Sequence, residues 1–284
     1  MFREIFLPLV DKFTFLNIFQ YITFRAAYAA VTALLISFIF GPKLIRALKK
    51  RKAGQEIRDD GPQTHLVKSG TPTMGGILIL LAVVISVLLW QDLGNYYTWL
   101  SLLSLVGFGA IGFVDDYLKV FRKSSAGLQA RFKFSAQVVV SLIIVLVIYF
   151  KDAEYATLLY VPFFKYPILD LSVMYIPFAV ILLVGFSNAV NLTDGLDGLA
   201  SGLIIPVGLA MGVITYLTGR VDYAEYLQIP YIRDSGELVI LSFALVGACV
   251  GFLWYNSHPA EIFMGDTGSL SLGGTIGVLA LMTK

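Results

Sequence analysis

The sequence predicts an all-α, polytopic integral membrane protein, and its composition carries this prediction. Of the 284 residues, 57% are hydrophobic and only 14% are charged, and the mean hydropathy is +0.79. Soluble domains have apolar and charged shares nearer ~45–50% and ~25%. The apolar residues also form continuous runs, whereas the strands of a membrane β-barrel alternate with a period of two, so the membrane-spanning elements are expected to be helices.

Eight charge-free segments account for the predicted transmembrane helices. Each can supply the roughly 20 residues that a helix needs to cross the hydrocarbon core. In chain order they are Ala26 to Pro42, Met74 to Trp90, Leu93 to Val114, Phe134 to Phe150, Leu171 to Thr193, Gly198 to Gly219, Leu238 to Ser257 and Thr267 to Thr283. Because the segment before the first helix contains Arg3, Glu4, Asp11 and Lys12, it does not read as a cleavable signal. We therefore expect one transmembrane domain over residues 1–284.

The basic residues of the loops predict the orientation of these helices. Eight Lys and Arg lie between Lys43 and Thr73 and five lie between Asp115 and Lys133, whereas the opposite side, both termini included, holds the remaining eight of the 21. Loops rich in Lys and Arg stay in the cytoplasm. The amino terminus and Lys284 are therefore expected outside, after eight crossings.

Five acidic residues lie at helix ends on the predicted cytoplasmic side. Asp115 and Asp116 end the third segment, Asp194 and Asp197 lie between the fifth and sixth, and Asp266 starts the eighth. Ionisable groups at a membrane boundary are costly to keep and usually functional. We expect these carboxylates to meet in one pocket that faces the cytoplasm.

The chemistry of this pocket points to a divalent cation and a phosphorylated substrate. Clustered carboxylates repel one another unless a metal ion or a proton lies between them, and hard oxygen ligands suit Mg²⁺. Glycines flank the acids, for example Gly195 and Gly265, so that a phosphate can approach the backbone. Lys68 and Thr73 enter the second helix from the same side as further phosphate-binding groups. The GxxxxGK[ST] pattern of a Walker loop is absent.

Four motifs resemble the phospho-N-acetylmuramoyl-pentapeptide transferase family, within the polyprenyl-phosphate N-acetylhexosamine-1-phosphate transferase superfamily. They are Lys68-Ser-Gly-Thr-Pro-Thr-Met-Gly-Gly76, Phe113-Val-Asp-Asp-Tyr-Leu-Lys119, the run from Asn188 to Leu199, and Asn256 through Met264-Gly-Asp-Thr-Gly-Ser269. The resemblance implies transfer of phospho-N-acetylmuramoyl-pentapeptide from UDP-MurNAc-pentapeptide to undecaprenyl phosphate, which gives lipid I and UMP and requires Mg²⁺. It also implies a location in the bacterial inner membrane.

The resemblance assigns roles to individual positions. Asp115, Asp116 and Asp266 match the catalytic aspartates of the family, and Asp266 matches the magnesium ligand. One aspartate of the adjacent pair either deprotonates the lipid phosphate or attacks the nucleotide, and the sequence does not choose between these. Positions that line the nucleotide and active-site cleft are matched by Lys68, Thr73, Asn191, Asp194, Gly195, Asp197, Asn256 and Phe263. Lys123, Arg131 and Lys133 are expected to supply positive charge for a lipid or nucleotide phosphate.

Several alternatives stay open at this point. Members of the family continue for two more helices, which are joined by a loop with a Pro-x-His-His-His cluster. We therefore expect that the chain is shortened at its carboxyl end. An inactive fragment is one alternative. The others are a transferase specific for UDP-GlcNAc and an ion-coupled transporter, although a transporter predicts acids within the apolar segments. Membrane lipids are expected around the helices, no nucleic-acid partner is expected, and the resemblance leaves a homodimer open.

Overall fold

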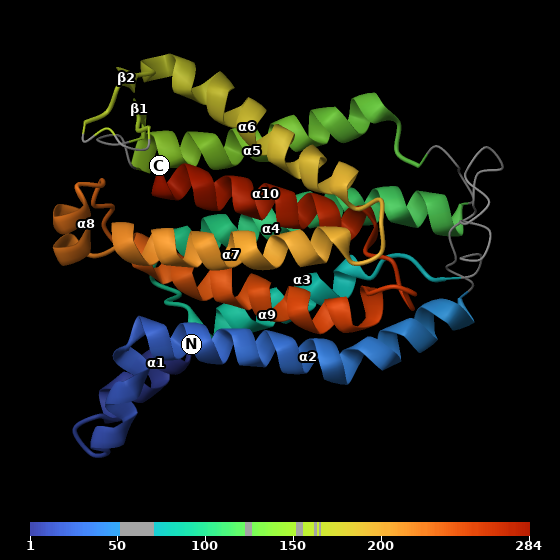
Figure 1. The fold of residues 1–284 in the computed structure, drawn as a ribbon, viewed down its shortest axis with the longest axis horizontal. Helices are drawn as coiled ribbons and strands as arrows, with labels where there is room; N and C mark the ends of the chain where they lie inside the picture. The colour runs from blue at the N-terminus through green and yellow to red at the C-terminus, as the bar shows by residue number, and fades with distance from the viewer. Residues whose placement is uncertain (52–70, 123–126, 152–155, 162–163, 165) are drawn as a thin grey trace.

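The computed structural model describes residues 1–51, 71–122, 127–151, 156–161, 164 and 166–284. Within them, long helices run side by side along the longest axis of the molecule, and both termini lie at the same end (Figure 1). The helices are α1 (Phe2–Phe6), α2 (Ile22–Lys50), α3 (Gly76–Trp90), α4 (Tyr96–Phe121), α5 (Ala130–Lys151), α6 (Tyr175–Thr193), α7 (Leu199–Thr218), α8 (Val221–Leu227), α9 (Leu238–Asn256) and α10 (Gly265–Thr283). Short 3₁₀ turns cover Leu7–Leu9, Thr14–Gln20, Ser172–Met174 and Ser235–Glu237.

One small β-hairpin interrupts the helical pattern. Its strands are β1 (Leu158–Leu159) and β2 (Leu169–Asp170), which pair antiparallel with Leu158 opposite Asp170. The hairpin lies between α5 and α6, near the end of the bundle that carries the termini (Figure 1). The hairpin was not predicted from the sequence, because two-residue strands leave no periodic pattern to detect.

Every predicted transmembrane segment lies largely within a helix, and the all-α, multi-pass membrane class is confirmed. Among the described residues, six helices are long and apolar enough to cross a membrane: α2, α4, α5, α6 with its preceding turn, α7, and α9 with its preceding turn. The α3 helix has 15 residues, about 22 Å at 1.5 Å per residue, whereas the hydrocarbon core is ~30 Å thick. The α10 helix is rich in glycine, serine and threonine. Eight crossings and the external amino terminus therefore remain predictions.

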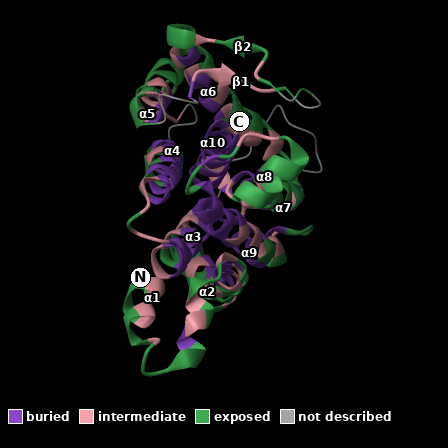
Figure 2. Ribbon diagram, turned by 90° about the vertical axis from the view of Figure 1, so that its left-hand side faces the viewer, coloured by how far each residue is buried: buried purple, intermediate pink, exposed green. Residues whose placement is uncertain are grey.

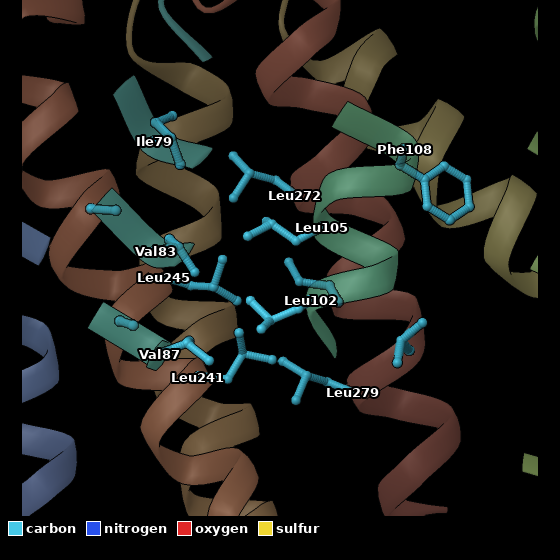
Figure 3. Packing of buried hydrophobic residues seen from close by; sticks show 14 of the residues in the cluster. Ile79, Val83, Val87, Leu102, Leu105, Phe108, Leu241, Leu245, Leu272 and Leu279 are labelled. Atoms are coloured by element: carbon cyan, nitrogen blue, oxygen red, sulfur yellow. The ribbon is translucent and has the colours of Figure 1, made fainter. Parts of the chain in front are cut away.

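Helices α9 and α10 form the centre of the bundle. Nearly all of α10 is buried, and it packs against α4 and α6, whereas α9 packs against α2, α7 and α3. Leucine and valine side chains from α3, α4, α9 and α10 interlock between them, with Leu105 beside Leu272 and Val83 beside Leu245 (Figure 3). Buried residues accordingly concentrate in the middle of the molecule and exposed ones on the outer helices (Figure 2). The outer helices expose large apolar side chains such as Ile181 and Phe150, as a lipid-facing surface requires.

A buried ion pair closes the end of the bundle that carries the termini. The Arg25 guanidinium on α2 donates to both carboxylate oxygens of Glu237, at 2.8 and 2.6 Å, and also to the Trp90 carbonyl oxygen at 3.2 Å. The Asp92 backbone N–H donates to Glu237 Oε2 at 3.0 Å. Arg25 is 1% exposed. This pair therefore joins α2, the end of α3 and the start of α9 far from the predicted acidic site.

We predict that Arg25→Met destabilises the fold, because Glu237 is left as a buried charge without its partner. Loss of one partner of a buried pair costs about 3–5 kcal/mol, which a lower thermal unfolding midpoint of the detergent-solubilised protein would reveal. The double variant Arg25→Met with Glu237→Met should recover much of the loss, since it leaves no unpaired charge. Arg220→Met, which removes the exposed pair with Asp222, is the control and should change stability by less than ~1 kcal/mol. An unchanged midpoint in Arg25→Met would contradict the prediction.

Candidate functional site

Three carboxylates meet where α4 ends and α10 begins. One oxygen each from Asp115, Asp116 and Asp266 lies within 4.8 Å of the others, and both residues of the α4 pair are buried. The two backbones touch at this point, because a Cβ at Gly112 of α4 would lie 2.1 Å from the Asp266 carbonyl oxygen. Only glycine fits there, and its absence of a side chain brings the acids of two helices together.

The loop before α3 pairs with the loop before α10. The Gly75 N–H donates to the Phe263 carbonyl oxygen at 2.9 Å, the Gly76 N–H donates to the Met264 carbonyl oxygen at 2.8 Å, and the Phe263 N–H donates to the Pro72 carbonyl oxygen at 2.9 Å. This pairing brings Thr73, one of the predicted site residues, to the start of α10. A Cβ at Gly265 would lie 2.9 Å from Thr73 Oγ1.

Two ammonium groups compensate the carboxylates. Lys133 Nζ of α5 lies 2.7 Å from Asp266 Oδ2, and Lys119 Nζ lies 3.0 Å from the same oxygen and 2.5 Å from Asp115 Oδ2. Lys133 was among the predicted site residues, but Lys119 was not assigned a role. Its signal in the sequence is the spacing, since a lysine four residues after Asp115 lies on the same face of the helix.

The end of α6 contributes an amide and a further carboxyl group. Asn191 Nδ2 donates to Asp266 Oδ1 at 2.9 Å and to Ser269 Oγ at 2.8 Å. Asp194 follows the helix, and burial raises its pKa to about 8, with the Asp266 and Asp116 carboxylates acting in the same direction. At neutral pH this carboxyl group is therefore largely protonated unless a cation approaches it.

Asn256 and Asp197 lie in a neighbouring network that joins the α6–α7 turn to the α9–α10 loop. Asn256 is buried, and its Oδ1 accepts from the Gly198 N–H at 3.1 Å while its Nδ2 donates to the Ile262 carbonyl oxygen at 2.9 Å. Asp197 Oδ2 lies 3.1 Å from His258 Nδ1. Asn256 thus holds two loops together. Gly195 lies exposed in the same turn.

The remaining predicted cations are not joined to the carboxylates in the described part of the chain. Arg131 is exposed, and its Nε donates to Gln129 Oε1 at 3.0 Å. Lys68 and Lys123 lie outside the described residues. Phosphate contacts of these three side chains therefore stay predictions.

A cavity of about 510 Å³ lies at the other end of the bundle, away from the acids. The residues that line it are mainly apolar and include Ile214 and Leu217 of α7 and Ile229 after α8. None of its lining residues is an aspartate or a glutamate. The carboxylates, the amide and the two lysines near α10 are therefore the stronger candidate for a catalytic site.

The carboxylate cluster offers hard oxygen ligands in a place where negative charge is concentrated. One or two carboxylates together with substrate phosphate oxygens are the usual surroundings of Mg²⁺ in proteins. Asp115 and Asp266 fit this pattern, because both already hold a cationic group, the Lys119 ammonium, between them. The site can therefore bind a divalent cation together with an anionic substrate.

Comparison with known proteins places the chain in a family. The profile of glycosyl transferase family 4 matches residues 98–284, and signature 1 of the phospho-N-acetylmuramoyl-pentapeptide-transferases matches residues 68–80. The curated phospho-N-acetylmuramoyl-pentapeptide-transferases of Thermodesulfovibrio yellowstonii, a Geobacter species and Rickettsia prowazekii are 51%, 50% and 49% identical to it. Each match covers 100% of this chain and 79% of the relative. The chain therefore belongs to the phospho-N-acetylmuramoyl-pentapeptide-transferase family.

Proposed function

We propose that the protein transfers phospho-N-acetylmuramoyl-pentapeptide from UDP-MurNAc-pentapeptide to undecaprenyl phosphate, giving lipid I and UMP, with Mg²⁺ as cofactor. The observation that carries the proposal is the meeting of Asp115, Asp116 and Asp266 beside Lys119 and Lys133 at one end of a membrane bundle. The names of the relatives, at about half identity over the whole chain, supply the transferred group, phospho-N-acetylmuramoyl-pentapeptide. The UDP-linked donor and the undecaprenyl phosphate acceptor are what the family resemblance of the four motifs implies.

The metal would be held by Asp266 with Asp115 beside it. When bound, Mg²⁺ supplies positive charge next to the pyrophosphate, where negative charge grows on the leaving UMP. Asn191 keeps the Asp266 carboxylate in place, because its amide donates to the oxygen that the lysines do not contact. The residues present therefore fit a magnesium ion with one or two protein ligands.

Lys119 and Lys133 would bind the phosphate oxygens of the two substrates. Phosphoryl transfer between two anions depends mainly on charge neutralisation and in-line placement. Both ammonium groups reach Asp266 from different helices, so they flank the position where a pyrophosphate would lie. Thr73, Asp194, Gly195, Asp197 and Phe263 would form the surrounding nucleotide cleft, with Asn256 supporting its loops and Lys68, Lys123 and Arg131 adding positive charge.

Proton transfer in this reaction needs only a weak base. An unperturbed aspartate has a pKa near ~3.9, and the second pKa of a phosphate monoester is near ~6. The acceptor phosphate is therefore largely deprotonated at neutral pH, and an aspartate of the α4 pair has to remove only the remaining proton. A large pKa shift is not required.

We further propose that the protein lies in the bacterial inner membrane and that its acidic site faces the cytoplasm. The carboxylates lie at the end of the bundle where α2 ends, and the final turns of α2 and the loop after it contain Lys43, Arg46, Lys49, Lys50 and Arg51. Basic segments of this kind stay in the cytoplasm. An external amino terminus follows from this orientation, because α2 is the first long helix, and eight crossings follow if α3 and α10 also span the membrane. The nucleotide donor would then enter from the cytoplasm and the lipid phosphate from the inner interface.

The donor is tested with the full chain, Mg²⁺ and undecaprenyl phosphate, offered either UDP-MurNAc-pentapeptide or UDP-GlcNAc. We expect UMP release with the first donor only, because the signature at residues 68–80 and the named relatives point to it. Release of UMP with UDP-GlcNAc alone would move the protein to the related class of hexosamine-1-phosphate transferases. Absence of release with both donors would contradict the proposed activity for this chain.

We predict that Asp266→Asn lowers kcat by at least ~100-fold, since even residues that only support a metal ligand change activity by 10–100-fold. The thermal unfolding midpoint should stay close to that of the unmodified protein, because the amide keeps the size of the carboxylate. Asp222→Asn on α8, whose carboxylate pairs with exposed Arg220, is the matched control and should leave kcat unchanged. A near-normal, Mg²⁺-dependent rate in Asp266→Asn would remove Asp266 from the metal site.

A further inference from the structure

The two adjacent aspartates of α4 have different surroundings. Both oxygens of Asp116 are occupied by the start of α10: Oδ1 accepts from the Asp266 N–H at 3.0 Å, and Oδ2 accepts from the Thr267 N–H at 2.9 Å and from Thr267 Oγ1 at 2.6 Å. Backbone N–H groups in the first turn of a helix have no partner within the helix. Asp116 therefore supplies the acceptors that α10 lacks.

The start of α10 has no such acceptor of its own. Its N-cap residue is Met264, which makes no side-chain capping hydrogen bond. A negative charge near a helix N-terminus is favourable because of the helix dipole. Asp266 lies in the first turn of α10, but its carboxylate contacts Lys119 and Lys133. The carboxylate that accepts from the N–H groups of this turn comes from another helix, since Asp116 belongs to α4.

Asp115 is covered by a lysine side chain instead of by the start of a helix. Its Oδ1 accepts from the Leu128 N–H at 2.8 Å, and its Oδ2 lies 2.5 Å from Lys119 Nζ. Asp115 and Asp116 are equally buried, at 2% and 3% exposed, but the Lys119 side chain that covers Asp115 Oδ2 is 40% exposed. A substrate phosphate that displaces Lys119 thus reaches Asp115 before it can reach Asp116.

The packing leaves Asp116 little freedom to turn toward a substrate. Gly112, one helical turn before it on the same face of α4, touches the Asp266 carbonyl oxygen. Gly265 adopts a φ of +75°, and a Cβ there would lie 2.7 Å from Asp116 Oδ2. The carboxylate is therefore enclosed by the backbone of the helix that it contacts.

We propose that Asp116 is a positioning residue, which caps α10 from outside and so fixes the direction of the Asp266 carboxylate, while contact with the substrates falls to Asp115. The inference rests on the proposed function, because it assumes that Asp266 holds the metal ion. The family resemblance matches Asp115 and Asp116 alike to catalytic aspartates, whereas the contacts in the structure give the two residues different roles.

The test compares Asp116→Asn, Thr267→Val and their double variant with Asp115→Asn, using Mn²⁺ affinity, kcat and the pH profile of kcat. We expect Asp116→Asn to weaken Mn²⁺ binding and lower kcat by roughly 10–100-fold, the range seen for residues that orient a metal ligand. Thr267→Val, which leaves Asp116 in place but removes one of its donors, should weaken Mn²⁺ binding by a smaller factor. The double variant should be no weaker than Asp116→Asn, because both changes disrupt the same contact and such effects do not add.

Two controls separate positioning from direct action. Thr275→Val removes a buried hydroxyl of α10 that donates only to the Ser271 carbonyl oxygen, and it should leave Mn²⁺ affinity and kcat unchanged. The acid limb of the pH profile of kcat should stay at the same pH in Asp116→Asn, because a residue that only positions Asp266 exchanges no proton with the substrates. Asp115→Asn, which removes a group placed against the substrates, should lower kcat more than Thr267→Val does.

The inference is overturned if Asp116→Asn lowers kcat and shifts the acid limb while Mn²⁺ affinity stays unchanged, because Asp116 then acts on the substrate itself. It is also overturned if Thr267→Val binds Mn²⁺ like the unmodified protein, and this variant decides the question even if Asp116→Asn does not fold. A protein that releases no UMP but shows the expected loss of Mn²⁺ affinity in both variants would contradict the proposed function alone. Failure of the unmodified protein to bind Mn²⁺ would overturn the metal assignment and the inference together.

Discussion

Charged groups in a membrane bundle are constrained to the places where helices begin and end. In the apolar interior an unpaired charge has no water to solvate it, whereas a helix terminus offers free N–H or C=O groups and access to the interface. The described bundle keeps its ionised groups at its two ends. At one end Arg25 and Glu237 neutralise each other completely. At the other, the carboxylates of α4 and α10 share two lysines that a substrate can reach.

Charged groups at helix ends thus serve two purposes in this bundle: one set stabilises the packing of helices, and the other forms the candidate site. The Arg25 pair is bidentate, deeply buried and supported by two further hydrogen bonds, so it stabilises one arrangement of α2, α3 and α9. The acidic end is only partly enclosed, and its cations lie on side chains that are 40% and 17% exposed. Ammonium groups on long flexible side chains can exchange one anionic partner for another, which suits a site that handles phosphates.

Much of this arrangement could be predicted from the sequence. Long apolar segments define the helices, and alternate loops place Asp115, Asp194 and Asp266 on one side without any knowledge of packing. The contacts that distinguish individual residues could not be predicted. Thr267 meets Asp116, and Lys119 meets Asp266, only because α4 approaches α10. The hydrogen bonds by which Asn256 joins two loops likewise depend on the packing. Such differences depend on distances across helices that are far apart in the chain, and a motif carries no information about them.

The glycines at the crossing of α3, α4 and α10 have a consequence for how the protein works. A Cβ at Gly76 would lie 2.0 Å from the Gly268 backbone nitrogen, and one at Gly112 would meet α10 as closely. The backbones of α3 and α4 thus each touch the start of α10, which leaves these helix ends little room to move independently. The dipoles and carboxylates near α10 are therefore preorganised, so little reorganisation is needed when charge shifts during the reaction. Adjustment to the incoming phosphates then falls to side chains, such as the partly exposed Lys119 and Lys133, and not to the helix backbones.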